Sequence, residues 1–107
     1  NNLAKDMCEV NYISYDACYN IAKDWGAKNI MACEDIAQNA YANIKELTVN
    51  ALVKNNVSQD NPKIDNIINY KVEYCKDGCS DYVNRKKKQQ QKKMINDCIK
   101  GMTANSK

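Results

Sequence analysis

The sequence predicts an all-α protein, a compact bundle of about five helices stapled by three disulfides. Apolar residues recur at spacings of three and four along most of the chain, and no stretch alternates in the way a strand does. Six cysteines in 107 residues are an even number in a small chain, as expected for three disulfides. The length allows a single domain, residues 1–107.

The first quarter of the chain predicts two helices. Leu3, Met7 and Val10 recur at helical spacing and mark the first. Ser14 is an N-cap candidate for the second, and Gly26 predicts its end. The apolar positions of this second helix are Tyr15, Cys18, Tyr19, Ala22 and Trp25.

A central helix follows, marked by the strongest periodic pattern in the sequence. One continuous apolar stripe runs along it, as expected for a helix that packs against the rest of a bundle. Its alanines favour close contact with neighbouring helices. The stripe consists of Ile30, Cys33, Ala37, Ala40, Tyr41, Ile44, Leu47 and Ala51.

The last two predicted helices follow a polar stretch that ends at Pro62, a residue suited to a first helical turn. Gly78 predicts the end of the fourth helix, Ser80 the start of the last segment, and Gly101 its end. The apolar positions of the fourth helix are Ile64, Ile67, Ile68, Val72 and Cys75. Those of the last segment are Val83, Met94, Ile95, Cys98, Ile99 and Met102.

The cysteine positions constrain how these helices are joined. Cys18 and Cys33 lie almost symmetrically about Gly26, so an antiparallel helical hairpin would bring them to the same level. We therefore expect Cys18 to pair with Cys33. Fifteen connectivities are open to six cysteines.

The remaining four cysteines are expected to tie distant parts of the chain together. A bridge between Cys75 and Cys79 would close a very tight loop, so we expect their partners to be Cys8 and Cys98. If residues 80–100 formed one straight helix, Cys79 and Cys98 would lie about 28 Å apart and could not pair.

Composition argues against an enzyme. The chain contains no histidine, and imidazole carries most acid–base catalysis, nucleophile activation and catalytic zinc binding near neutral pH. Cys75 and Cys79 form the only close cysteine pair, so we expect no metal site and no cofactor. No apolar run approaches the eighteen residues or so of a membrane span.

The most unusual feature is the basic segment, residues 85–93, which holds six of the 16 lysines and arginines of a chain with 13 acidic residues and a formal net charge of +3. As a helix it would form a cationic ridge able to bind a sulfated polysaccharide, a phosphate polymer, an anionic lipid or an acidic protein surface. The alternative is a solvated face that keeps the protein in solution. The candidate binding residues are Arg85, Lys86, Lys87, Lys88, Lys92 and Lys93.

Tyrosines supply a second candidate surface. The chain has seven Tyr, one Trp and no Phe, so nearly every aromatic ring carries a hydroxyl that needs a partner or water. Tyr12, Tyr15 and Tyr19 are expected in the core, whereas Tyr70, Tyr74 and Tyr82 flank the basic segment and are candidate binding residues.

Cysteine usage predicts a secreted, extracellular protein. The first residues include no initiator Met and no apolar signal core, which fits a mature form whose signal peptide has been removed. Asn56-Val57-Ser58 is a glycosylation sequon inside a polar stretch.

The run from Cys8 through Trp25 to Cys33, together with size, cysteine content and an Asn- and Lys-rich composition, resembles the small salivary proteins of blood-feeding flies, the anticomplement proteins of sand fly saliva in particular. The insect odorant-binding fold also carries six cysteines on helices, but its Cys-x3-Cys pair comes early, whereas Cys75 and Cys79 come fourth and fifth here. The salivary resemblance implies a secreted helical inhibitor that binds early components of the host complement cascade. The resemblance does not identify any binding residue in this sequence.

We therefore expect a monomeric secreted inhibitor that binds a host plasma protein, a complement component, and blocks the cascade in the early steps of its classical pathway. Neither nucleic acid nor a membrane span is expected. One alternative is a polyanion- or glycosaminoglycan-binding anticoagulant acting through the basic segment. The other is a carrier of odorant-binding type, with a small hydrophobic ligand in an apolar cavity between helices.

Overall fold

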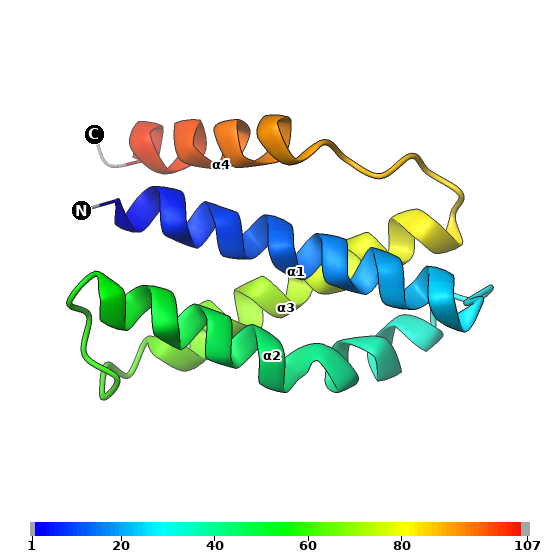
Figure 1. The fold of residues 1–107 in the computed structure, drawn as a ribbon, viewed down its shortest axis with the longest axis horizontal. Coiled ribbons are helices and arrows are strands. Elements are labelled where there is room, and N and C mark those ends of the chain that lie inside the picture. Colours follow the sequence, from blue (N-terminus) through cyan, green and yellow to red (C-terminus); the bar gives the residue numbers. More distant parts are fainter. Residues whose placement is uncertain (1, 106–107) are drawn as a thin grey trace.

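The computed structural model describes residues 2–105, with the backbone alone described for residues 103–105. The chain forms four helices, α1 (Leu3–Trp25), α2 (Ala32–Lys54), α3 (Ile64–Val83) and α4 (Gln91–Asn105). Consecutive helices run in opposite directions, and α4 lies along the N-terminal half of α1 (Figure 1). The described part of the chain contains no strand, so the all-α prediction is confirmed.

The helices number four rather than about five because residues 3–25 form one helix. Ser14 is a buried residue in the middle of α1, not an N-cap. It shares one face of α1 with Met7, Asn11, Cys18 and Ala22, all of them buried. Packing of this continuous face outweighs the local preference of serine for a helix start. The predicted end is confirmed, since Gly26 has a φ of 64° at the C-cap.

Gly78 and Gly101 both lie inside helices, so the predicted helix ends at these glycines are wrong. Gly78 is buried against α1, and a Cβ atom there would overlap the carbonyl oxygen of Tyr15. The glycine lets the backbones of α1 and α3 approach closely. Gly101 has no such neighbour, because a Cβ atom at that position would meet nothing within 4 Å.

The central helix predicted by the alanine-rich stripe is α2. Ala37, Ala40 and Ile44 are buried, as that stripe requires. Ile30 lies before the first residue of α2, and Tyr41 and Leu47 are exposed, so the buried face is narrower than the apolar pattern.

Three disulfides and no free cysteine confirm the predicted number of bridges. The expected Cys18–Cys33 pairing is wrong, because α3 packs against both α1 and α2 and its two cysteines, one turn apart, each bridge a different helix. The expected pairing of Cys8 and Cys98 with those two is also wrong. The bridges are Cys8–Cys98, Cys18–Cys75 and Cys33–Cys79.

The core has two parts. One surrounds the bridges Cys18–Cys75 and Cys33–Cys79 and includes the buried side chains of Ile36 and Ile44. The other lies toward the opposite end of the bundle, where Met7, Leu52, Ile64 and Ile68 pack together. None of the described helices has a stretch apolar and long enough to cross a membrane.

Candidate functional site

The basic segment does not form the cationic ridge that the sequence predicts. Its residues 86–90 are extended, and only residues 91–93 belong to a helix, the first turn of α4. It leaves α3 through a turn in which Arg85 has a φ of 59° and the Lys86 amide donates to the Asp81 carbonyl. The segment then runs back alongside α1 to reach α4 (Figure 1).

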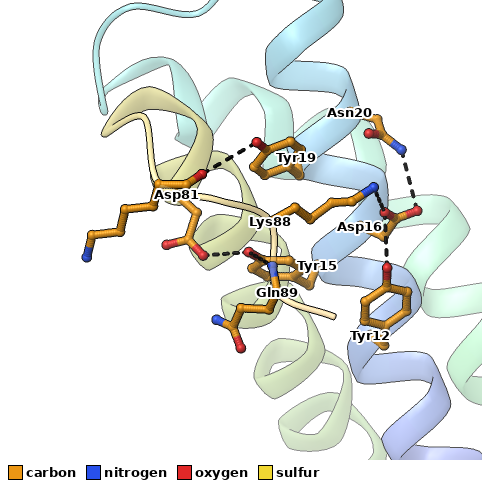
Figure 2. Close-up of polar contacts among 9 residues, drawn as sticks. Tyr12, Tyr15, Asp16, Tyr19, Asn20, Asp81, Lys88 and Gln89 are labelled. Atoms are coloured by element: carbon orange, nitrogen blue, oxygen red, sulfur yellow. Dashed lines mark hydrogen bonds and ion pairs between the residues drawn. The ribbon is translucent and has the colours of Figure 1, made fainter. Parts of the chain in front are cut away.

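Tyrosine hydroxyls on α1 hold the extended part in place, as Figure 2 shows. The Tyr15 hydroxyl donates to Asp81 and accepts a hydrogen bond from the Gln89 amide at 3.1 Å. Burial, reinforced by the bond to Asp81, raises the pKa of Tyr15. The Tyr19 hydroxyl donates to the Lys86 carbonyl at 3.5 Å. Tyr15 is therefore in the core as predicted, but it also positions the basic segment.

Of the three lysines in the extended part, Lys88 is the one whose ammonium group pairs with a side chain of α1. Its ammonium lies 2.7 Å from Asp16 Oδ1 and 5.6 Å from the centroid of the Tyr19 ring. The hydrogen bond to Asp16 raises the pKa of Lys88. Asp16 also accepts hydrogen bonds from Tyr12 and Asn20, so it is the centre of this polar cluster (Figure 2).

The other cations of the basic segment are exposed. Lys93 pairs with Asp97 at 2.8 Å within the first turns of α4. Among the described residues, no carboxylate forms an ion pair with Arg85, Lys86, Lys87 or Lys92. These four side chains are thus available to an external anion.

The three candidate tyrosines do not form one surface. Tyr82 packs edge-to-face on Tyr19, with centroids 5.6 Å apart, beside the start of the basic segment. Tyr70 and Tyr74 pack edge-to-face on each other, with ring centroids 5.4 Å apart, nearer the N-terminal end of α3. Burial raises the pKa of Tyr74 to about 12. Both of these tyrosines line a cleft whose position and lining residues the sequence did not identify.

This cleft lies between α1, α3 and α4 and has a volume of about 730 Å³. Its volume lies within the range of about 300–1,000 Å³ that small-molecule sites occupy. Most of its wall is apolar. The lining residues are Leu3, Met7, Asn11, Leu52, Lys63, Asn66, Ile67, Tyr70, Lys71, Tyr74, Asp97, Cys98, Gly101 and Met102.

Lys71 is the unusual member of the cleft. Its side chain is 4% exposed, and its ammonium donates to the Met7 carbonyl at 3.2 Å and lies 5.8 Å from the Tyr70 ring centroid. Burial lowers the pKa of Lys71 to about 8. No carboxylate pairs with Lys71 within residues 2–105, where six ion pairs are described.

Sequence reasoning missed Lys71, although the sequence carried a signal. Ile64, Ile68 and Cys75 are buried at spacings of four and seven on one face of α3, and Lys71 falls on the same face. A lysine at such a position is either a buried cation or a long apolar stem whose charge reaches water. Its low exposure shows that it is the former.

No group of three or more side chains able to hold a metal ion occurs in the described part of the chain. Family models, curated proteins and solved structures were each compared with this chain, and none matches it.

Proposed function

We propose that the protein is a secreted inhibitor that binds a plasma protein through its basic segment, with an early component of the complement cascade as the first candidate target. The observation that carries the proposal is the set of four exposed cations that form no ion pair with any described residue, on a segment anchored to α1. The salivary resemblance of the sequence supplies the choice of complement.

Anchoring supports recognition because a held segment loses less conformational entropy on binding than a free one. Lys88 and Lys93 are already engaged by Asp16 and Asp97, so contacts with a partner fall to their neighbours. Clustered cations attract an acidic surface and accelerate association, an effect that weakens as salt rises. Three disulfides suit a protein that works outside the reducing interior of the cell.

The test reverses three of the unpaired cations, in the variant Lys86→Glu, Lys87→Glu, Lys92→Glu. We expect the concentration needed to inhibit complement deposition on an antibody-coated surface to rise by about tenfold or more, because the contact depends on charge. Raising salt above physiological strength should slow association of the wild type and affect the variant less.

A charge-matched control separates the basic segment from net charge. Lys28, Lys45 and Lys100 are exposed lysines on other segments, and changing all three to Glu alters the net charge by the same amount. This control should change the concentration needed for inhibition by less than about threefold, since isolated surface charges contribute little to binding. An equal loss of complement inhibition in both variants, or no loss in either, would refute the role of the basic segment.

Retention on immobilised heparin distinguishes the polyanion alternative. If the basic-segment variant loses heparin retention and keeps complement inhibition, the basic segment binds polyanions and the inhibitory surface lies elsewhere. A second candidate function, carriage of a small ligand, is favoured by the cleft between α1, α3 and α4.

A further inference from the structure

We propose that the cleft between α1, α3 and α4 binds a small amphiphile with a single carboxylate on an apolar chain, and that the carboxylate pairs with Lys71. The apolar chain would lie along the walls formed by α1 and α4. The site uses neither the basic segment nor an inhibitory surface, so this inference is independent of the proposed inhibition and rests on the second candidate function, carriage of a small ligand in this cleft.

The charge of Lys71 is what identifies the head group. A buried ammonium is stable only when paired or hydrogen-bonded. Among the described residues that of Lys71 has one acceptor, the Met7 carbonyl, for three N–H donors. A carboxylate in the cleft would accept the remaining donors and supply the missing opposite charge. The head group is expected to carry one charge, because a single buried cation offsets one negative charge and leaves a second uncompensated.

One carboxylate, that of Asp97, is among the described residues that line the cleft, but it does not pair with Lys71. Asp97, on α4, is exposed and already pairs with Lys93. Lys63, which precedes α3, is an exposed cation at the rim. The tyrosines at positions 70 and 74 offer hydroxyls, and the lining residues of α1 and α2 are Leu3, Met7, Asn11 and Leu52, which carry no charge.

The walls identify the tail. Leu3 and Met7 on α1, Leu52 on α2, Ile67 on α3 and Met102 on α4 line the cleft. Burial of an alkyl chain against such side chains contributes roughly 0.8 kcal/mol per CH₂ group. The cleft thus combines an apolar wall with one fixed polar group, as sites for small amphiphiles do.

Helix α4 forms one side of the cleft and is joined to the bundle at α1. Among the described helices the backbone of α4 comes close to α1 alone, and the Cys8–Cys98 bridge ties it there. No disulfide links α4 to α3, so apart from the connecting residues 84–90 these two walls of the cleft are held together by non-covalent contacts alone.

Titration calorimetry with decanoate and decan-1-ol, below the concentration at which either aggregates, tests the proposal at pH 7. The two probes have the same chain and differ in the head group. We expect the wild type to bind decanoate at least about tenfold more tightly than decanol, as a charge-assisted pair in a buried site requires. The variant Lys71→Met should lose this difference and keep its affinity for decanol.

Lys63→Met is the matched control, because it removes a cation from the exposed rim of the same cleft. This substitution should change the dissociation constant for decanoate by less than about threefold. A wild type that binds neither probe, or a Lys71→Met variant that keeps the preference for decanoate, would overturn the proposal. Circular dichroism of Lys71→Met establishes that the variant is folded.

A second measurement needs no variant. The ¹³Cε resonance of Lys71 reports its protonation, and decanoate should raise the pKa of Lys71 from about 8, whereas decanol should not. An unchanged titration at saturating decanoate would place the carboxylate away from Lys71 and refute the assignment.

Discussion

Helices α3 and α4 both pack against α1, but they approach it differently. At the α3 interface the backbones touch where Gly78 faces Tyr15, and the Cys18–Cys75 bridge adds a covalent link. At the α4 interface one bridge, Cys8–Cys98, joins the helices and a cleft remains beside it. Helix α1 thus carries a close backbone contact with α3 in one part and the wall of the cleft beside α4 in another.

The largest expected effect concerns the close interface. Gly78→Ala should lower the free energy of unfolding by about 3 kcal/mol, because the added methyl group overlaps a backbone oxygen that cannot move without shifting α1. Urea unfolding followed by circular dichroism measures this difference.

Gly101→Ala is the counterpart in α4. Open space surrounds this position, so alanine should raise the free energy of unfolding by about 0.5–1 kcal/mol through its higher helix propensity. Equal effects at the two glycines would show that the α3 interface is not closer than the α4 interface.

The buried Lys71 makes the stability of the protein depend on pH. Its pKa of about 8 in the folded protein lies below the 10.5 of a free lysine, so the unfolded chain binds more protons between these values. Stability therefore rises with pH above about 8, by about 1.4 kcal/mol per unit at most. Burial raises the pKa of Tyr15 and Tyr74, whose unfolded forms ionise near pH 10 and then reverse the trend.

The expected result is a gain of about 1–2 kcal/mol in the wild type between pH 7 and pH 9.5. Lys71→Met should abolish this gain and be more stable than the wild type at pH 7, since replacing a buried charge with an apolar side chain removes its desolvation penalty. Parallel pH profiles for the two proteins would contradict a buried, charged Lys71.

The last comparison concerns the hydrogen bonds by which α1 holds the basic segment. Tyr15→Phe removes a hydroxyl that bonds both Asp81 and the Gln89 amide, and should lower the free energy of unfolding by about 1–2 kcal/mol. Tyr12→Phe loses one weak bond to Asp16 and should have an effect below about 0.5 kcal/mol. Faster amide exchange at Gln89 in the first variant alone would confirm the anchor.

Sequence patterns predicted the central helix and the end of α1, but not that the buried face of residues 3–25 is continuous. The α2 stripe and the Gly26 end followed from local periodicity and backbone preference. The disulfide pairing did not, because it depends on α3 lying against both α1 and α2, which spacing along the chain does not encode. Gly78 was ambiguous for the same reason, since a glycine that permits close packing is identical in sequence to one that ends a helix.

The basic segment shows a second limit of local reasoning. Lysine and glutamine are good helix formers, so the run predicted a ridge. The chain instead uses residues 86–90 as an extended connection, which covers about 3.3 Å per residue against 1.5 Å in a helix. Hydrogen bonds to Tyr15, Asp16 and Tyr19 on α1, remote in sequence, stabilise that conformation.

The Cys8–Cys98 bridge affects what proteolysis does to the protein. It closes the backbone between these residues, 90 positions apart, into a covalent ring that contains the other four cysteines. A single peptide-bond cleavage anywhere within this ring leaves two fragments that remain one molecule. Cleaved protein would therefore migrate as the full mass on a non-reducing gel and separate only after reduction, and a nick in an exposed loop would leave every helix tethered.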